Sequence, residues 1–164
     1  MKAHFETLAG YNRWANRRVY DAAAGLNAAQ YREPRGAFFG SIHGTLNHIL
    51  VGDRLWLRRL TGEGPQPSRL DEILFEDMTS LRAAREAEDE RIVGFVGGLG
   101  EADWERVLVY RNVAGKEQST VIREVLAHFF NHQTHHRGQA HAILTSLGQK
   151  SVELDLIYYL RERS

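Results

Sequence analysis

Prolines are confined to three positions, so most of the chain lacks the residue that most strongly breaks helices. They stand at Pro34, Pro65 and Pro67 and leave three long stretches uninterrupted. In the first stretch, apolar residues recur at steps of three and four, the spacing of one helix face: Phe5, Leu8, Ala15, Val19, Ala22 and Leu26. This pattern predicts a helix over about residues 3–24 that ends near Gly25.

The same periodicity predicts further helices. Ser41 is a suitable N-cap for a second helix, over about residues 40–61. The remaining predicted elements are a third helix from residue 79 or 80 to residue 96, a hairpin over residues 106–119, a fourth helix over residues 120–148 and a short helix over residues 154–160. The charged run REAEDER inside the third helix is interpreted as a solvated face. Four long helices and one sizeable crossover predict an all-α four-helix bundle, formed by a single domain over residues 1–164.

Composition limits the classes of function. The chain carries 21 basic and 21 acidic residues, so no net charge would hold a nucleic acid or an anionic membrane. It has no cysteine, which excludes disulfides, thiolate metal ligands and a cysteine nucleophile. No apolar run approaches the roughly 18 residues of a membrane span, and the N-terminal residues lack the apolar segment of a signal peptide. We therefore expect a soluble cytoplasmic protein with neither a membrane nor a nucleic-acid partner.

Histidines are unusually concentrated, because five of the eight lie between His128 and His141. Each residue of an ideal helix advances by about 100°. That rotation places five side chains on one face of the predicted fourth helix: His128, His132, His135, His136 and Gln139. Two imidazoles four residues apart can meet at one metal ion, and both His132 with His136 and His128 with His132 have that spacing. The alternative is histidines at the surface or hydrogen-bonded in the core, although a metal would satisfy several buried imidazoles together.

A third metal ligand has to come from another helix, and His48 is the best candidate. Gly44 and Gly52 lie about one turn on either side of it. Glycine inside a helix costs about 0.5 to 1 kcal/mol relative to alanine, a penalty accepted where a ligand or backbone comes close. We expect these glycines to leave space around His48, the alternative being that they only let two helices pack closely.

Three segments resemble the hallmark segments of the DinB/YfiT-like metalloenzymes. They are YNRWAN at residues 11–16, SIHGTLNHILVGDRLWLRRLTG at residues 41–62 and NHQTHHRGQ at residues 131–139. The resemblance implies a bundle of up-down-down-up topology with a hairpin before the last long helix. It implies a divalent metal ion held by three histidines, which by position are His48, His132 and His136.

The resemblance also implies a homodimer. The aromatic residues Trp104, Tyr158 and Tyr159 agree with one if a single small core does not absorb them.

Other polar residues of these segments are assigned supporting roles. Asp53 lies among apolar residues, where an unpaired carboxylate would be costly. We expect it to accept a structural hydrogen bond from the first helix, through Asn12, Asn16 or the Trp14 indole. The side chains predicted to orient the metal ligands or to line a pocket are His128, His135 and Gln139.

Three neutral imidazoles without a protein carboxylate would leave a divalent ion with an open coordination position, as in catalytic zinc sites. Zinc and nickel suit nitrogen ligands. Such an ion can activate water or bind a thiol, and the resemblance implies low-molecular-weight thiol S-transferases among the relatives. The sequence leaves three functions open: thiol transfer to a small-molecule substrate, metal-dependent hydrolysis, and non-catalytic binding of a metal or small ligand.

Overall fold

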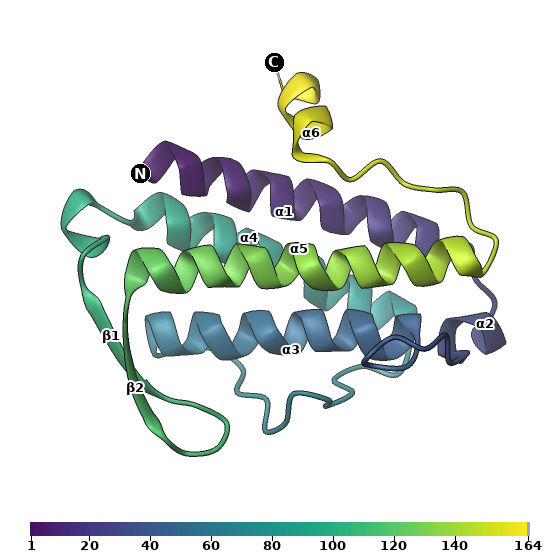
Figure 1. The fold of residues 1–164 in the computed structure, drawn as a ribbon, viewed down its shortest axis with the longest axis horizontal. Helices are drawn as coiled ribbons and strands as arrows, with labels where there is room; N and C mark the ends of the chain where they lie inside the picture. The colour runs from purple at the N-terminus through teal and green to yellow at the C-terminus, as the bar shows by residue number, and fades with distance from the viewer. Residues whose placement is uncertain (164) are drawn as a thin grey trace.

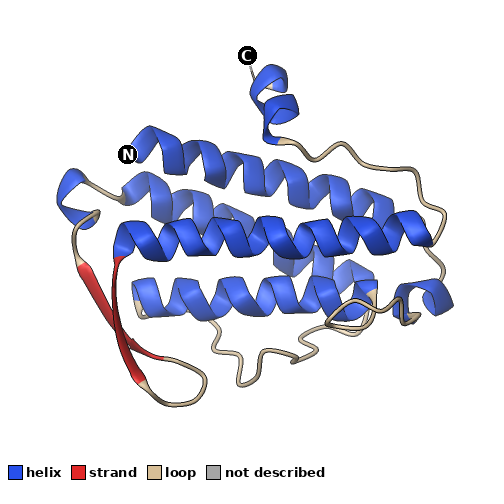
Figure 2. Ribbon diagram, viewed as in Figure 1, coloured by secondary structure: helices blue, strands red, loops and turns tan. Residues whose placement is uncertain are grey.

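The computed structural model describes residues 1–163 as a bundle of four long helices with a β-hairpin at one end (Figures 1 and 2). The long helices are α1 (Lys2–Ala23), α3 (Ile42–Thr61), α4 (Met78–Gly98) and α5 (Ile122–Ser146). The smaller elements are α2 (Ala28–Arg32), the 3-10 turn η1 (Glu101–Asp103), β1 (Val107–Arg111), β2 (Glu117–Val121) and α6 (Leu156–Glu162). The predicted all-α class, the small hairpin and the short C-terminal helix are confirmed.

The bundle has up-down-down-up topology. Helices α1 and α5 run in one direction and α3 and α4 in the other (Figure 1). The crossover over residues 62–77 produces this order, because it carries the chain from the end of α3 back along the bundle to the start of α4. Helices α3 and α5 are therefore antiparallel neighbours, and the middle of each faces the other.

Local chemistry sets the ends of the helices near this interface. The Ser41 hydroxyl accepts a hydrogen bond from the backbone N–H of Gly44 at 3.2 Å, which confirms it as an N-cap. Gly62 ends α3 with a φ of 78°, a left-handed conformation that suits glycine. Helix α5 begins at Ile122, slightly later than predicted, because β2 continues to Val121 and pairs with Val107.

A buried polar layer divides the apolar core into two clusters. Phe5, Trp104 and Phe129 belong to the cluster nearer the hairpin, whereas Val19 and Leu144 belong to the other. Between them, each long helix contributes polar side chains: Asn12 and Asn16 from α1, Asp53 from α3, Arg85 and Asp89 from α4, and Gln133 and Arg137 from α5. The middle of the bundle is thus held by hydrogen bonds and ion pairs.

This layer corrects the interpretation of REAEDER as a solvated face. Arg85, Glu88 and Asp89 are only 1–3% exposed. Partners of opposite charge offset part of the cost of burying them: Arg85 pairs with Asp53 and Asp89, and Glu88 pairs with Arg54. A run of mixed charge gives no periodicity that separates its inward from its outward residues.

Trp104 and Tyr159, two of the aromatic residues cited in support of a homodimer, pack within the chain itself. Trp104 is 2% exposed and stacks on Phe5 with ring centroids 5.6 Å apart, so the core does absorb it. Tyr159 of α6 packs against Trp14 of α1 at 5.9 Å. The homodimer therefore stays a prediction that rests on the family resemblance. Within residues 1–163, no helix combines the length and the apolarity that a membrane crossing requires.

Candidate metal centre

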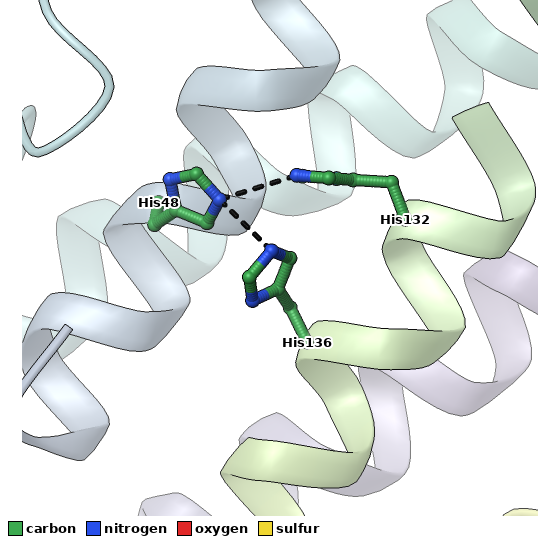
Figure 3. Close-up of side chains that lie close together, drawn as sticks. All are labelled: His48, His132 and His136. Carbon is green, nitrogen blue, oxygen red and sulfur yellow. Dashed lines mark hydrogen bonds between the residues drawn. The ribbon is translucent and has the colours of Figure 1, made fainter. Parts of the chain in front are cut away.

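Helices α3 and α5 bring three histidines together at their point of contact. His48 extends from α3, and His132 and His136 extend from successive turns of α5 (Figure 3). The Nε2 atom of His48 lies 3.2 Å from Nε2 of His132 and 3.2 Å from Nε2 of His136. One ring nitrogen from each histidine lies within 4.8 Å of the other two. The three predicted ligands therefore converge.

The hydrogen bonds on the far side of two of these rings fix where their protons are. Nδ1 of His48 lies 2.8 Å from the carbonyl oxygen of Leu70, which can only accept, so this nitrogen carries the proton. Nδ1 of His136 lies 2.8 Å from Oε1 of Gln139 and donates in the same way. Both Nε2 atoms therefore present lone pairs to each other across 3.2 Å. Two acceptors at that distance need a cation between them.

The spacing also fits a metal ion. Nitrogen ligands at 2.0–2.1 Å from a tetrahedral ion are about 3.3 Å apart, close to the separations observed around His48. A proton bound to one of these rings would not take the place of the metal ion at neutral pH, because the pKa values of the rings are too low. Burial lowers the pKa of His48 to about 4, despite the bond to Leu70, and burial with the neighbouring histidines lowers the pKa of His132 to about 3. Burial also lowers the pKa of His136. All three rings are neutral near pH 7, as metal ligation requires.

Two residues that hold His48 were not identified from the sequence. The ring of Phe39 stacks on His48 with centroids 3.6 Å apart and an interplanar angle of 15°, and it meets His136 edge-on. The Leu70 carbonyl orients the other side of the ring. Both residues lie in loops, where no periodicity predicts a contact. The acceptor at Leu70 is a backbone carbonyl, which every residue type carries, so the sequence does not point to it.

The two glycines beside His48 act differently from the expectation. A Cβ on Gly52 would lie 2.7 Å from Cε1 of His132, so this glycine makes room for the ligand on the opposite helix. A Cβ on Gly44 would lie 2.1 Å from the carbonyl oxygen of Phe39. Gly44 therefore admits the loop that carries Phe39, and it affects His48 through that ring.

Replacing Gly52 with alanine tests this packing directly. Because the new methyl group would displace the His132 ring, we expect the affinity for a divalent ion to fall by roughly tenfold or more. Gly138→Ala is the matched control, since that position on α5 has open space. Both substitutions bring the same gain in helix propensity, and only Gly52→Ala adds a contact that the His132 ring must move to relieve. Metal titrations that show equal affinities for the two variants would contradict this account.

The three side chains predicted near the ligands, and His141 further along α5, have different surroundings. Gln139 orients His136, and its amide nitrogen lies 3.3 Å from Nε2 of the exposed His135. His128 is exposed, and its ring lies 5.2 Å from Trp56 and 5.9 Å from His132. His141 turns away from the centre and bonds to Ser151 at 2.9 Å. A pair made of His128 and His132 is thus not the convergent one.

The prediction that Asp53 accepts a hydrogen bond from the first helix is wrong. Asp53 accepts from Arg85 of α4 and Gln133 of α5. The reason is the packing order: α1 lies mainly against α4 and α5, so its asparagines meet Asp89 of α4 instead, at 3.1 Å from Asn12 and 2.9 Å from Asn16. The Trp14 indole, the third donor suggested for Asp53, bonds to Glu162 of α6.

This network supports the metal centre from behind. Gln133, which directly follows His132, donates to Asp53 and accepts from Arg137 at 3.0 Å. Arg137 in turn donates to Asn12 and Asn16 of α1. Asn12 and Asp53 are therefore held in this network by partners that the sequence did not identify. The network fixes the rotation of α5 and with it the direction of both histidines.

The centre opens onto a cleft on one side. His48, Gly52 and His132 form one end of a cavity of about 270 Å³, and Trp56 and His128 line its wall. Within residues 1–163, no carboxylate joins the cluster of three histidines. A bound ion would keep an open coordination position toward this cavity.

Comparisons with known proteins identify the family of this chain and one of its relatives. The sequence model of the DinB family matches residues 1–163. The chain is 26% identical over 156 residues to Protein DinB of Bacillus subtilis (strain 168), an alignment that covers 92% of this chain and 90% of that protein.

Proposed function

Because the chain belongs to the DinB family, we propose that it binds one divalent metal ion through His48, His132 and His136 and uses that ion in catalysis. The observation that carries the proposal is the pair of Nε2 lone pairs, on His48 and His136, that face each other across 3.2 Å. Zinc or nickel is the ion that suits three nitrogen ligands. When bound, it supplies a Lewis acid with an open coordination position.

The side chains around the ion have separable tasks. The Leu70 carbonyl and Gln139 keep the protons of His48 and His136 on Nδ1, so that Nε2 is free to bind. Phe39 covers one face of His48 and excludes water from it. Although the His128 side chain reaches solvent, its ring lines the cleft, and this partial burial and the charge of Arg59 lower its pKa. His128 is therefore a neutral imidazole in the cleft, able to accept a proton from an incoming thiol or water.

Transfer of a low-molecular-weight thiol to a small electrophile is the reaction we propose first. The chain has no cysteine, so the thiol would belong to the cosubstrate, and the cleft beside the histidines offers room for it. Thiol S-transferases also occur in the family that the sequence resembles. Metal-dependent hydrolysis is the alternative with the same ligands, and a bundle that binds a metal or small ligand without turnover is the non-catalytic alternative.

One set of assays separates these three functions. Zinc-loaded and nickel-loaded protein are mixed with 1-chloro-2,4-dinitrobenzene and glutathione, cysteine or coenzyme A, and in parallel with 4-nitrophenyl acetate without thiol. In the first reaction a sulfur–carbon bond forms and chloride leaves. We expect metal-dependent turnover with at least one thiol, lost in His132→Ala and kept in His141→Ala. Turnover of the ester alone would favour hydrolysis, and the absence of both would favour the non-catalytic bundle.

A further inference from the structure

The cleft beside the metal centre continues into a second cavity beneath the hairpin. The first cavity, of about 270 Å³, contains His48 and His132. The second, of about 510 Å³, extends along the end of α3 to β1 and the turn that follows it. The two cavities share lining residues and therefore adjoin: Leu55, Arg59, Tyr110, Asn112 and Val113. Together they form a groove that begins at His48 and His132 and ends near the hairpin turn.

The groove is positively charged although the whole chain has no net charge. Its lining includes Arg58, Arg59 and Arg111 and, within the described chain, no aspartate or glutamate. The cavity between α1 and α4 is a useful contrast, because its arginines alternate with Glu86, Asp89 and Glu90. A cleft lined by charge of one sign attracts ligands of the opposite sign.

Arg59 differs from the other two arginines of the groove. Arg58 donates to the Gly64 carbonyl at 2.7 Å and to Gln66 at 3.0 Å. Arg111 donates to the Gly115 carbonyl at 2.9 Å and pairs with Glu117, which lies outside the groove lining, at 3.7 Å. Arg59 has no hydrogen bond or ion pair within residues 1–163.

The Arg59 guanidinium instead packs against two aromatic rings that also contact each other, with centroids 5.1 Å apart. It is 4.6 Å from the ring centroid of Trp56 and 5.0 Å from that of Tyr110. These contacts hold the guanidinium plane in place and leave its N–H donors unused. Arginine stays protonated at neutral pH.

We propose that the groove binds a small organic acid whose carboxylate pairs with Arg59 while its other end reaches the metal centre. The proposal rests on the metal-dependent function proposed above. A single free guanidinium matches a single planar carboxylate, which it can bind through two parallel hydrogen bonds. The apolar side chains of Leu55, Val109 and Val113 line the groove and suit the carbon chain of such an acid.

Matched pairs of thiols test this directly. Protein loaded with Co²⁺ is titrated with ω-mercaptocarboxylates of three, six and eight carbons and with the ω-mercaptoalcohols of the same lengths, and thiolate binding is followed by its charge-transfer absorbance. At the length that spans the groove, we expect the carboxylate to bind roughly tenfold or more tightly than the alcohol. Arg59→Gln should remove this preference, and Arg59→Lys should keep part of it, because it retains the charge but loses the planar fork.

Two controls separate this proposal from the proposed function. Arg17→Gln changes an arginine of the cavity between α1 and α4 and should leave the preference intact. Elemental analysis of Arg59→Gln should show the same cobalt content as the wild type, since Arg59 does not contact the three histidines.

Metal-free protein is titrated with the same six-carbon pair while the Trp56 indole N–H resonance is followed. If cobalt does not bind, the proposed metal function fails, and this titration still reports any carboxylate preference at Arg59. Equal binding of acid and alcohol at every length, or a preference that survives in Arg59→Gln, would overturn the inference.

Discussion

Replacing Arg85 with methionine is expected to lower the free energy of unfolding by about 3 to 5 kcal/mol, the cost of breaking a buried ion pair by removing one partner. The Arg85 and Asp53 side chains are 2% and 1% exposed, and Arg85 also lies 3.1 Å from Asp89. The substitution removes the positive charge and leaves two carboxylates in the core. Urea denaturation measures the loss, and Arg82→Met is the control on the same helix, because the ion pairs of Arg82 are exposed and worth about 1 kcal/mol or less.

The loss should depend on pH in a defined direction. Burial raises the pKa of Asp53 from 3.8 to about 7, although Arg85 opposes the shift, and removal of Arg85 raises it further. In the variant, the native state therefore retains a proton on Asp53 to higher pH than the wild type does. The stability gap should widen as the pH rises above about 7 and narrow as it falls below. A gap no larger than that of Arg82→Met, at pH 8, would contradict the structural role of this layer.

Removal of His132 is expected to abolish metal-dependent stabilisation. A ligand that binds only the folded state stabilises it by about 4 kcal/mol when its free concentration is 1,000 times the dissociation constant. For a chain of 164 residues this corresponds to a rise in Tm of roughly 8 to 16 °C. His132→Ala leaves only two imidazoles and should show little rise. His141→Ala, which removes a histidine outside the centre, should melt like the wild type with and without metal.

Acid should reverse this stabilisation. Unfolded histidine titrates near 6.5, whereas the folded pKa is about 4 for His48 and about 3 for His132. Between these values the unfolded state binds more protons, so the contribution of the neutral rings is complete above pH 6.5 and is lost as the pH falls toward 3. Metal binding steepens the loss, because protons compete with the ion at three ligands. Wild type and His132→Ala with the same melting profile from pH 5 to 8, in excess metal, would contradict the role of His132.

The histidine cluster shows how far sequence reasoning reaches. Three- and four-residue periodicity predicts the long helices, and the spacing of His132 and His136 follows from helical geometry alone. The sequence predicts His48, between two glycines, as the partner on α3, and the structure places His48 there. Periodicity determines which face of a helix is apolar, and here the ligands share that face.

The supporting residues could not be found in the same way. Arg85 and Asp89 lie within a charged run whose usual meaning is solvent exposure, and only the positions of their partners on α1 and α3 reverse that interpretation. Phe39 and Leu70 reach His48 from loops. Such contacts depend on the path of the backbone between helices, which residue type alone does not encode.

The most direct test of the metal centre is elemental analysis of the freshly purified wild-type protein beside His132→Ala and His141→Ala, after each is supplied with zinc or nickel and dialysed. We predict about one ion per chain in the wild type and in His141→Ala, and little in His132→Ala, because the Nε2 atoms of three histidines converge on one point. An absence of bound metal in the wild type, or equal metal content in the wild type and His132→Ala, would contradict it.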